Sequence, residues 1–151
     1  MKKLQQGRSM IEMLGVLAII GVLSIGGLAG YTMAMNRHRA NTILDYVSRC
    51  VVVAQTNGDG SYLTTGACKD ILGEEKPTFL ETDASITTTA GGGDITVEGD
   101  AATSAIADAL RNRSTDAIEI TGSAKDFTIT FNDAGKGFTS VKAAKTTGTE
   151  G

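Results

Sequence analysis

The most constraining feature of this chain is an apolar stretch that runs from Met10 to Met35 with a single charged side chain, Glu12. As an α-helix, these roughly 26 residues would be about 39 Å long, enough to cross a bilayer with some tilt. Basic residues lie on both sides, Lys2 and Lys3 before the stretch and Arg37 and Arg39 after it. The sequence therefore predicts one membrane-spanning helix near the N-terminus.

Two plainer interpretations compete with this one. A secretory signal peptide would explain the basic start, but the apolar stretch is about twice as long as the usual signal core. Only Ala29-Gly30 offers a weak cleavage site after it. A plain single-pass anchor is the second alternative. It does not explain Glu12, because a carboxylate in a membrane helix is energetically costly and is usually paired with another group. Arg8, four residues earlier, is one candidate partner, and a group in another subunit is the other.

Charge divides the chain into two parts. Residues 1–39 carry five basic and one acidic side chain, a net charge of +4, whereas residues 40–151 carry nine basic and sixteen acidic ones, a net charge of −7. An acidic body is a poor partner for nucleic acid, because binding phosphate requires clustered Lys and Arg. It suits an exported soluble domain, and we expect no specific nucleic-acid partner.

The residues around the start of the apolar stretch follow a known pattern. Lys2 and Lys3 open a short leader that ends at Gly7, Arg8 follows, and Glu12 is the fifth residue after Gly7, just ahead of the aliphatic run. This arrangement resembles the processing site of type IV prepilins and of the related pseudopilins. The resemblance covers about the first third of the chain. One departure is Arg8, since members of the family most often have Phe at that position, or Met in some branches.

The resemblance implies how the chain would be processed, inserted in the membrane and assembled. A prepilin peptidase would cut between Gly7 and Arg8 and methylate the new amine of Arg8. Before assembly, the chain would be a single-pass protein of the inner membrane with a cytoplasmic N-terminus. An assembly platform and its ATPase would then draw it into a helical homopolymer, either an extracellular pilus or a periplasmic pseudopilus. Glu12 would pair with the amine of a neighbouring subunit.

Small residues recur along the apolar helix, with glycine at Gly15, Gly21, Gly26 and Gly30. Gly26 and Gly30 have the four-residue spacing that lets apolar helices approach closely. The sequence therefore predicts helix packing through these glycines. The alternative is that glycine is simply commoner in membrane helices.

The helix is expected to continue past the membrane to about Thr56, giving a length of about 70 Å. Asp45 and Arg49 have the favourable i,i+4 order on the polar side. Apolar residues recur at helical spacing over this second half, so it should lie against a partner surface: Ala40, Ile43, Leu44, Val47, Val51 and Ala54.

Cys50 and Cys68 are the two cysteines of the chain. A disulfide between them would tie the end of the helix to the following loop and contribute about 3 kcal/mol on the chain-entropy model. Such bonds persist in extracytoplasmic compartments. Free thiols are one alternative, and a metal site is another, although two Cys and one distant His are too few ligands for a closed zinc site. We predict no metal and no cofactor.

Residues 57–141 have the pattern of a β-rich head. A short helical segment is expected at 69–72, and alternating apolar residues predict strands near 86–88, 95–97, 118–120, 127–131 and 138–141. A further helix is expected from Asp100, as N-cap, through Arg113, with an apolar face listing Ala102, Ala105, Ile106, Ala109 and Leu110. The polar residues 142–151 are expected to form a mobile tail.

Together these patterns predict an α+β fold in which a long N-terminal helix packs against a small antiparallel sheet of four or five strands with one extra short helix. The predicted organisation is a leader at 1–7, a membrane and filament-core helix at 8–35, its amphipathic continuation at 36–56, the head at 57–141 and the tail at 142–151.

No catalytic set is apparent in the sequence. The single histidine, His38, lies between two arginines next to the apolar stretch, which favours a solvated position. Residues 132–137 lack the upstream Gly and the Ser or Thr that a phosphate-binding loop needs, and residues 57–60 lack the later Glu of a calcium loop. Both are interpreted as turns. The absence of a catalytic set favours a protein that is not an enzyme. The resemblance to prepilins implies a structural subunit of a type IV pilus, with a minor pilin, a type II secretion pseudopilin or a monomeric membrane-anchored binding domain as alternatives.

Overall fold

The structure is a computed structural model of the full chain, and it describes residues 4–56, 62–88 and 93–145, with side chains from Ser9 onward. The chain divides into two compact units, Met1–Met35 and Asn36–Gly151. Each unit is described by itself below.

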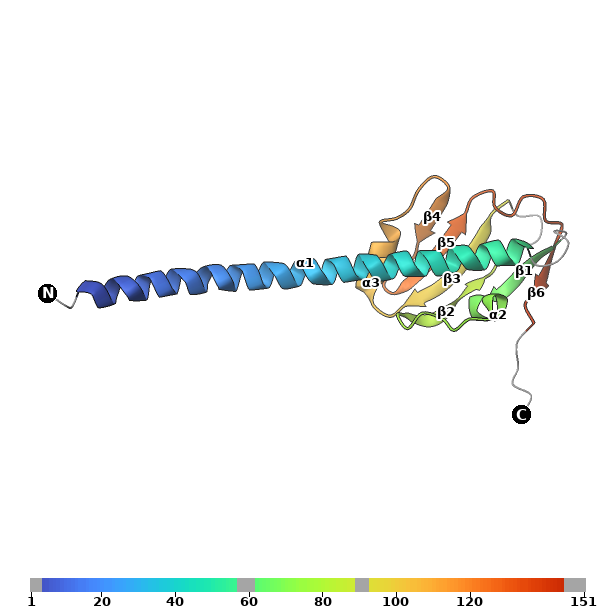
Figure 1. Ribbon diagram of the computed structural model, residues 1–151. Helices are drawn as coiled ribbons and strands as arrows, with labels where there is room; N and C mark the ends of the chain where they lie inside the picture. Colours follow the sequence, from blue (N-terminus) through green and yellow to red (C-terminus); the bar gives the residue numbers. More distant parts are fainter. Residues whose placement is uncertain (1–3, 57–61, 89–92, 146–151) are drawn as a thin grey trace, which may run out of the picture. The chain divides into compact units, whose positions relative to one another are not determined.

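The first element is a helix, α1, that spans Leu4–Thr56 and crosses the boundary between the two units (Figure 1). Its long run of apolar residues is interrupted by glycine but not by proline. Glycine weakens a helix by about 1 kcal/mol relative to alanine, whereas proline breaks it. The helix ends at Thr56, directly before the Asn57-Gly58 pair, as the sequence predicts.

The second unit is built on a six-stranded sheet in the order β4-β5-β3-β2-β1-β6. Figure 1 shows this sheet beside the C-terminal part of α1. The strands are β1 Tyr62–Ala67, β2 Leu80–Ile86, β3 Ile95–Ala101, β4 Ile118–Thr121, β5 Asp126–Phe131 and β6 Ser140–Ala143. The predicted α+β class, a long helix packed by a sheet, is therefore confirmed.

The sheet differs from the predicted antiparallel one, because β6 runs parallel to β1. Residues 132–139 carry the chain from β5, near one edge, across to β6 at the other edge. β6 then lies beside β1 with Tyr62 opposite Ser140 and Leu63 opposite Val141. The sheet is thus mixed, with one strand more than the largest number predicted.

Residues 36–56 of α1 cover one face of this sheet. The buried helix residues are Ala40, Ile43, Tyr46, Val47, Cys50, Val51 and Ala54, and they share a core with the inward side chains of the strands. Val97, Phe127 and Ile129 alternate with polar neighbours along their strands, so each strand has one apolar and one polar face. The amphipathic continuation of the helix thus has the partner surface that its pattern requires.

Gly99 shows how closely this core is packed. The ring of Phe127, directly opposite in β5, covers the space where a side chain at position 99 would begin. An added Cβ atom would lie 2.8 Å from Phe127 Cζ. Only glycine leaves room for the ring to lie across the strand.

Two short helices complete the second unit. α2 spans Cys68–Leu72, close to the predicted 69–72, and Gly73 ends it in the left-handed conformation with φ 70°. α3 spans Ser104–Arg111 and buries Ile106, Ala107 and Leu110.

The predicted start of α3 is wrong. Asp100 does not cap it, because β3 extends to Ala101 and Asp100 pairs within the sheet with Asp126. The N-cap is Thr103, whose side chain accepts a hydrogen bond from the backbone of Ile106. Ala105 was expected on the apolar face and is exposed. The longer strand shifts the helix start and so changes which alanine faces the core.

The predicted mobile tail is also partly wrong. Lys142 and Ala143 belong to β6, and the backbone N–H of Ala144 donates to the carbonyl of Thr65, 2.7 Å away. The last part of the predicted tail, 146–151, lies outside the described residues.

Candidate functional site

The predicted processing site lies in the first turns of α1. Gly7 and Arg8 are helical in their backbone, and the side chain of Arg8 lies outside the part that the structure describes. Glu12 follows one turn later with an exposed side chain. Within the first unit, the residues predicted for cleavage, methylation and pairing thus lie on consecutive turns of one helix.

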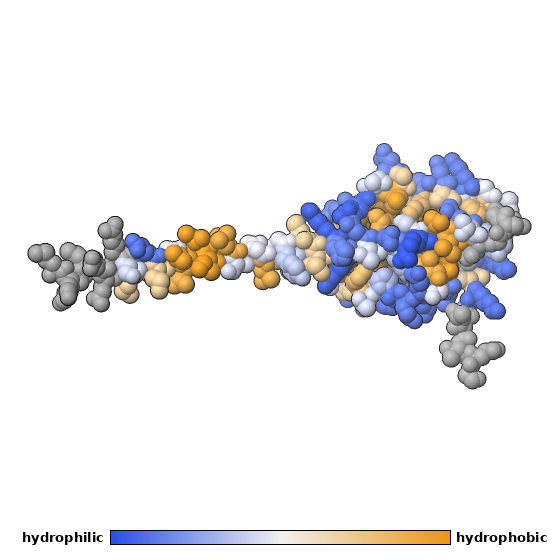
Figure 2. All heavy atoms as spheres, in the orientation of Figure 1, coloured by the Kyte–Doolittle hydropathy of each residue, from blue (hydrophilic) through white to orange (hydrophobic). Residues whose placement is uncertain are grey.

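The surface that follows Glu12 on α1 is apolar on every side. The large apolar side chains from Met10 to Met33 are between 54% and 75% exposed. In Figure 2 part of this stretch forms an orange cluster, the hydrophobic end of the scale. By length and composition it is the one helix among the described residues that could cross a membrane, and no part of its apolar window is buried within the chain. Soluble monomers rarely expose so large a continuous apolar surface.

The glycines predicted to mediate helix packing lie on this same surface. A Cβ atom added at Gly15, Gly21, Gly26 or Gly30 would meet no other atom within 4 Å. No described part of the chain therefore uses the space that these glycines leave.

The Cys50–Cys68 disulfide is present, with a Cα–Cα distance of 5.5 Å. Both cysteines are completely buried, Cys50 on α1 and Cys68 at the first position of α2. The two alternatives, free thiols and a metal site, are thereby excluded for this pair. Among the residues described, no other group of His, Cys, Asp and Glu could hold a metal ion.

A second link between α1 and the head involves Asp83 of β2, which the sequence did not indicate. The hydroxyl of Tyr46 donates to Asp83 Oδ1 at 3.0 Å, and the backbone N–H of Lys69 in α2 donates to Asp83 Oδ2 at 2.9 Å. Burial, together with the carboxylate of Asp83, raises the pKa of Tyr46 well above its usual value. One carboxylate thus joins the long helix, the sheet and α2.

Arg49 adds a link on the exposed side of α1. Its guanidinium lies 3.3 Å from Asp45, the predicted i,i+4 partner, and 3.0 Å from Glu74 in the loop after α2. Further along, the side-chain amide of Gln55 donates to the carbonyl of Ala134 at 2.7 Å. The segment 132–137 around Ala134 is a series of turns, as predicted, and so closes over the end of α1.

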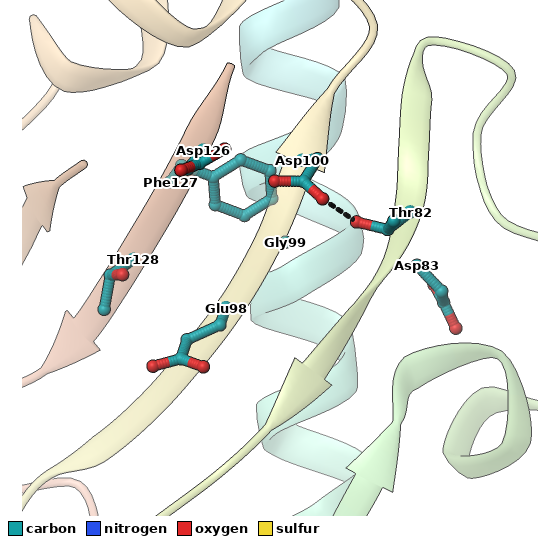
Figure 3. Close-up of a pocket in the computed structure, with 8 residues that line it drawn as sticks. All are labelled: Thr82, Asp83, Glu98, Gly99, Asp100, Asp126, Phe127 and Thr128. Atoms are coloured by element: carbon teal, nitrogen blue, oxygen red, sulfur yellow. Dashed lines mark hydrogen bonds between the residues drawn. The ribbon is translucent and has the colours of Figure 1, made fainter. Parts of the chain in front are cut away.

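The face of the sheet away from α1 is polar. It contains an open depression of about 400 Å³ over β2, β3 and β5 (Figure 3). Glu98, Asp100 and Asp126 contribute carboxylates to it, and Thr82 donates to Asp100 Oδ2 at 2.6 Å. Asp83 borders it, but its carboxylate is turned toward Tyr46 and Lys69. Neither a nucleophile with a base nor a set of metal ligands is present among the lining residues.

One edge of the sheet, at β4, is closed by its own chain. The backbone N–H of Asn132 in the β5 segment donates to the carbonyl of Ala117. Because bonded and non-bonded residues alternate along an antiparallel pair, the N–H and C=O groups of Ile118 and Ile120 point away from β5. The hydroxyl of Thr115 accepts from Ile118 N–H, and the hydroxyl of Ser114 accepts from Ile120 N–H. The backbone N–H of Thr115 donates to the Ile118 carbonyl at 2.7 Å. This edge offers few backbone groups to another strand.

The opposite edge, at β6, has no further strand beside it among the described residues. All four residues of β6 have exposed side chains. Apart from the pairing with β1, no backbone hydrogen bond of Val141 or Ala143 involves the described parts of the chain. Lys142 lies over the ring of Tyr62, with Nζ 5.3 Å from the ring centroid.

Comparison with known proteins adds no relative, since no family model, no curated protein and no solved structure matches the chain significantly.

Proposed function

We propose that this chain is a structural subunit of a type IV pilus, cut after Gly7 and assembled into a helical filament through α1. The observation that carries the proposal is the difference between the two parts of α1. In the second unit, one face of α1 is buried against its own sheet, whereas in the first unit the large apolar side chains from Met10 to Met33 are more than half exposed.

An apolar helix of this kind has two environments that would stabilise it. A bilayer covers it in the single-chain state, and identical helices cover it in a filament. The glycines at 15, 21, 26 and 30 support the second environment, because they leave open space on the helix surface that a neighbouring helix would fill. The proposed path is from the inner membrane, with the N-terminus in the cytoplasm, into the filament.

Glu12 is assigned a pairing role in this path. Cleavage between Gly7 and Arg8 creates a new amine five residues before Glu12. In the apolar interior of a bundle, a carboxylate and an ammonium group from different subunits would stabilise each other, whereas either charge alone would be costly. Assembly would therefore favour subunits that bring Glu12 next to the amine of a neighbour.

The partners follow from the same path: the prepilin peptidase, the assembly platform with its ATPase, and further copies of this chain. The proposed role requires no cofactor and no catalysis by this chain. The close alternatives, a minor pilin or a pseudopilin of type II secretion, share the processing site and differ in abundance. A major subunit would dominate sheared surface fibres, whereas a pseudopilin would stay scarce and periplasmic.

The test is the filament yield of a Glu12→Ala variant, measured as protein in the sheared surface fraction relative to total cellular protein. We expect at least a tenfold loss, about the effect of removing one partner of a desolvated charge pair. Glu98→Ala is the matched control, since Glu98 is an exposed carboxylate on the sheet, and its yield should stay at the wild-type level. A normal yield for Glu12→Ala would contradict the pairing role and favour a monomeric anchored domain.

A further inference from the structure

The two edges of the sheet carry opposite charges. At the β4 edge, Asp116 and Glu119 are exposed, and Arg113 is the only basic residue within 112–121. At the β6 edge, Lys142 and Lys145 are exposed, and residues 140–145 contain no acid. Among the ion pairs of the described residues, none involves any of these five side chains.

Glu119 and Lys142 also lie on the same face of the sheet. Ile120, next to Glu119, is buried in the core on the α1 side, so Glu119 points to the other face. Val141, next to Lys142, is paired with the buried Leu63, so Lys142 also points away from α1. Its position over Tyr62 agrees with this direction.

The two edge strands run in the same direction. β6 is parallel to β1, and each of the steps from β1 through β2, β3 and β5 to β4 is antiparallel. Four reversals return β4 to the direction of β1 and β6. Copies that share one orientation would therefore bring β4 of one copy alongside β6 of the next with Glu119 and Lys142 on a common face.

We propose that the β4 edge of one copy docks laterally against the β6 edge of the next copy, with Glu119 and Asp116 facing Lys142 and Lys145. The proposal rests on the proposed filament, because a contact between two different edges is head-to-tail and lets a polymer grow, whereas a contact between identical edges closes into a dimer. The occupant is thus a second copy of this chain.

The closed edge of β4 determines the kind of contact. Ser114 and Thr115 already bond the outward N–H groups of Ile118 and Ile120 and the Ile118 carbonyl, so these groups are not available to pair with β6 of a neighbour. Side-chain charges instead select the partner edge and its register. The same closure prevents unlimited sheet extension between heads.

The experiment is carbodiimide cross-linking of intact filaments, because this reagent joins a carboxylate to a lysine amine only when the two are in contact. We expect a peptide that links Glu119 or Asp116 to Lys142 or Lys145. Such a link cannot form within one chain, because the edge strands are roughly 24 Å apart across five strand spacings. Lys125 and Glu81, 2.7 Å apart in the same head, provide an internal control for the reaction.

A charge reversal supplies the second measurement. We expect E119K to lower the sheared filament yield about fivefold, the effect of one exposed charge pair lost at each contact, and the double variant E119K/K142E to restore it. E98K is the matched control on the same face, away from both edges.

The outcomes separate the two proposals. If no fibres form from the wild-type chain, the proposed function fails and this contact fails with it. Fibres that show the Lys125–Glu81 link but none between the two edges would overturn the lateral contact and leave the filament role intact. A purified chain that forms only dimers through β6 would likewise overturn it, in favour of sheet extension between identical edges.

Discussion

Tyr46 contributes more to the head than its place on an apolar helix face suggests. Its ring is buried in the core, and its hydroxyl reaches the carboxylate of Asp83, which also accepts from Lys69 of α2. The predicted apolar face of α1 did not include Tyr46, and Asp83 could not be identified as its partner, because 37 residues separate the pair. Contacts of this kind depend on the finished fold.

The raised pKa of Tyr46 gives a pH test. Because the folded pKa lies above the unfolded value of about 10, the corresponding stability is fully present below about pH 10 and is lost as the pH rises toward the folded pKa. We expect Tyr46→Phe to lower the free energy of unfolding by about 1.5 kcal/mol at neutral pH. Above about pH 10 the wild type should lose stability more steeply than the variant. Urea unfolding of the full chain in detergent, followed by circular dichroism at several pH values, measures both.

If the free energy of unfolding of the wild type and of Tyr46→Phe fell equally with pH across this alkaline range, the stabilising role of the Tyr46 hydroxyl would be contradicted. The comparison with Tyr46→Phe is needed because other groups also affect stability at alkaline pH, and their contributions cancel in the difference.

Gly122 lies between β4 and β5, and any residue with a side chain would be strained at this position. Its φ is 130°, and a Cβ atom there would lie 2.3 Å from the backbone oxygen of Asp126. We expect Gly122→Ala to lower the free energy of unfolding by at least about 3 kcal/mol, through the clash and the unfavourable φ together. Thermal unfolding of the variant measures the loss.

Gly137 is the matched control for this prediction. It also has a positive φ, 100°, but nothing lies within 4 Å of an added Cβ atom. Gly137→Ala should therefore cost only the backbone strain, about 1–2 kcal/mol. Equal losses for the two variants would show that the contact with Asp126 is not the cause.

At the scale of elements, the disulfide fixes the end of α1 to the start of α2. Replacing both Cys50 and Cys68 by alanine should lower the free energy of unfolding by about 3 kcal/mol, because the unfolded chain regains the freedom of the closed loop. The measurement is urea unfolding with and without a reducing agent. The wild type should lose this stability on reduction, and the double variant should not respond. A wild type whose stability does not change when the bond is shown to be reduced would contradict the prediction.

Local patterns predicted the elements that local forces determine. The second half of α1 follows from apolar spacing, and the start of β3 from the alternation at 95–97. The strand expected near 86–88 was placed too late, since β2 spans Leu80–Ile86. β1 and the parallel position of β6 could not be predicted. Their residues lack a strong alternation, and the parallel pairing of β1 with β6 joins segments about 78 positions apart, so only the assembled sheet selects it.

The start of α3 shows how tertiary pairing can override a local signal. Both Asp100 and Thr103 are good N-cap residues. Asp100 is drawn into β3 by its neighbours in β2 and β5, which leaves Thr103 as the cap. We expect Thr103→Ala to lower the free energy of unfolding by about 1 kcal/mol and Asp100→Ala to leave the helix content unchanged, as measured by thermal unfolding and circular dichroism.

At the scale of the whole molecule, one half of the candidate site could be proposed from the sequence and the other could not. Residues 7–35 could be described in advance, because membrane length, a lone acid and a basic leader are properties of a linear segment. The charged edges of the head could not be described in advance. Glu119 and Lys142 lie on opposite edges only because β4 and β6 are the outer strands of one sheet. Surface contacts between copies depend on topology and therefore require the structure.

The central claim is that the chain is cut after Gly7 before it assembles, and the N-terminus of the exported protein tests it most directly. Intact mass and N-terminal sequencing of protein sheared from cells that contain the peptidase should give a chain that begins at Arg8 with a methylated amine. A sheared protein that still begins at Met1 would contradict the account.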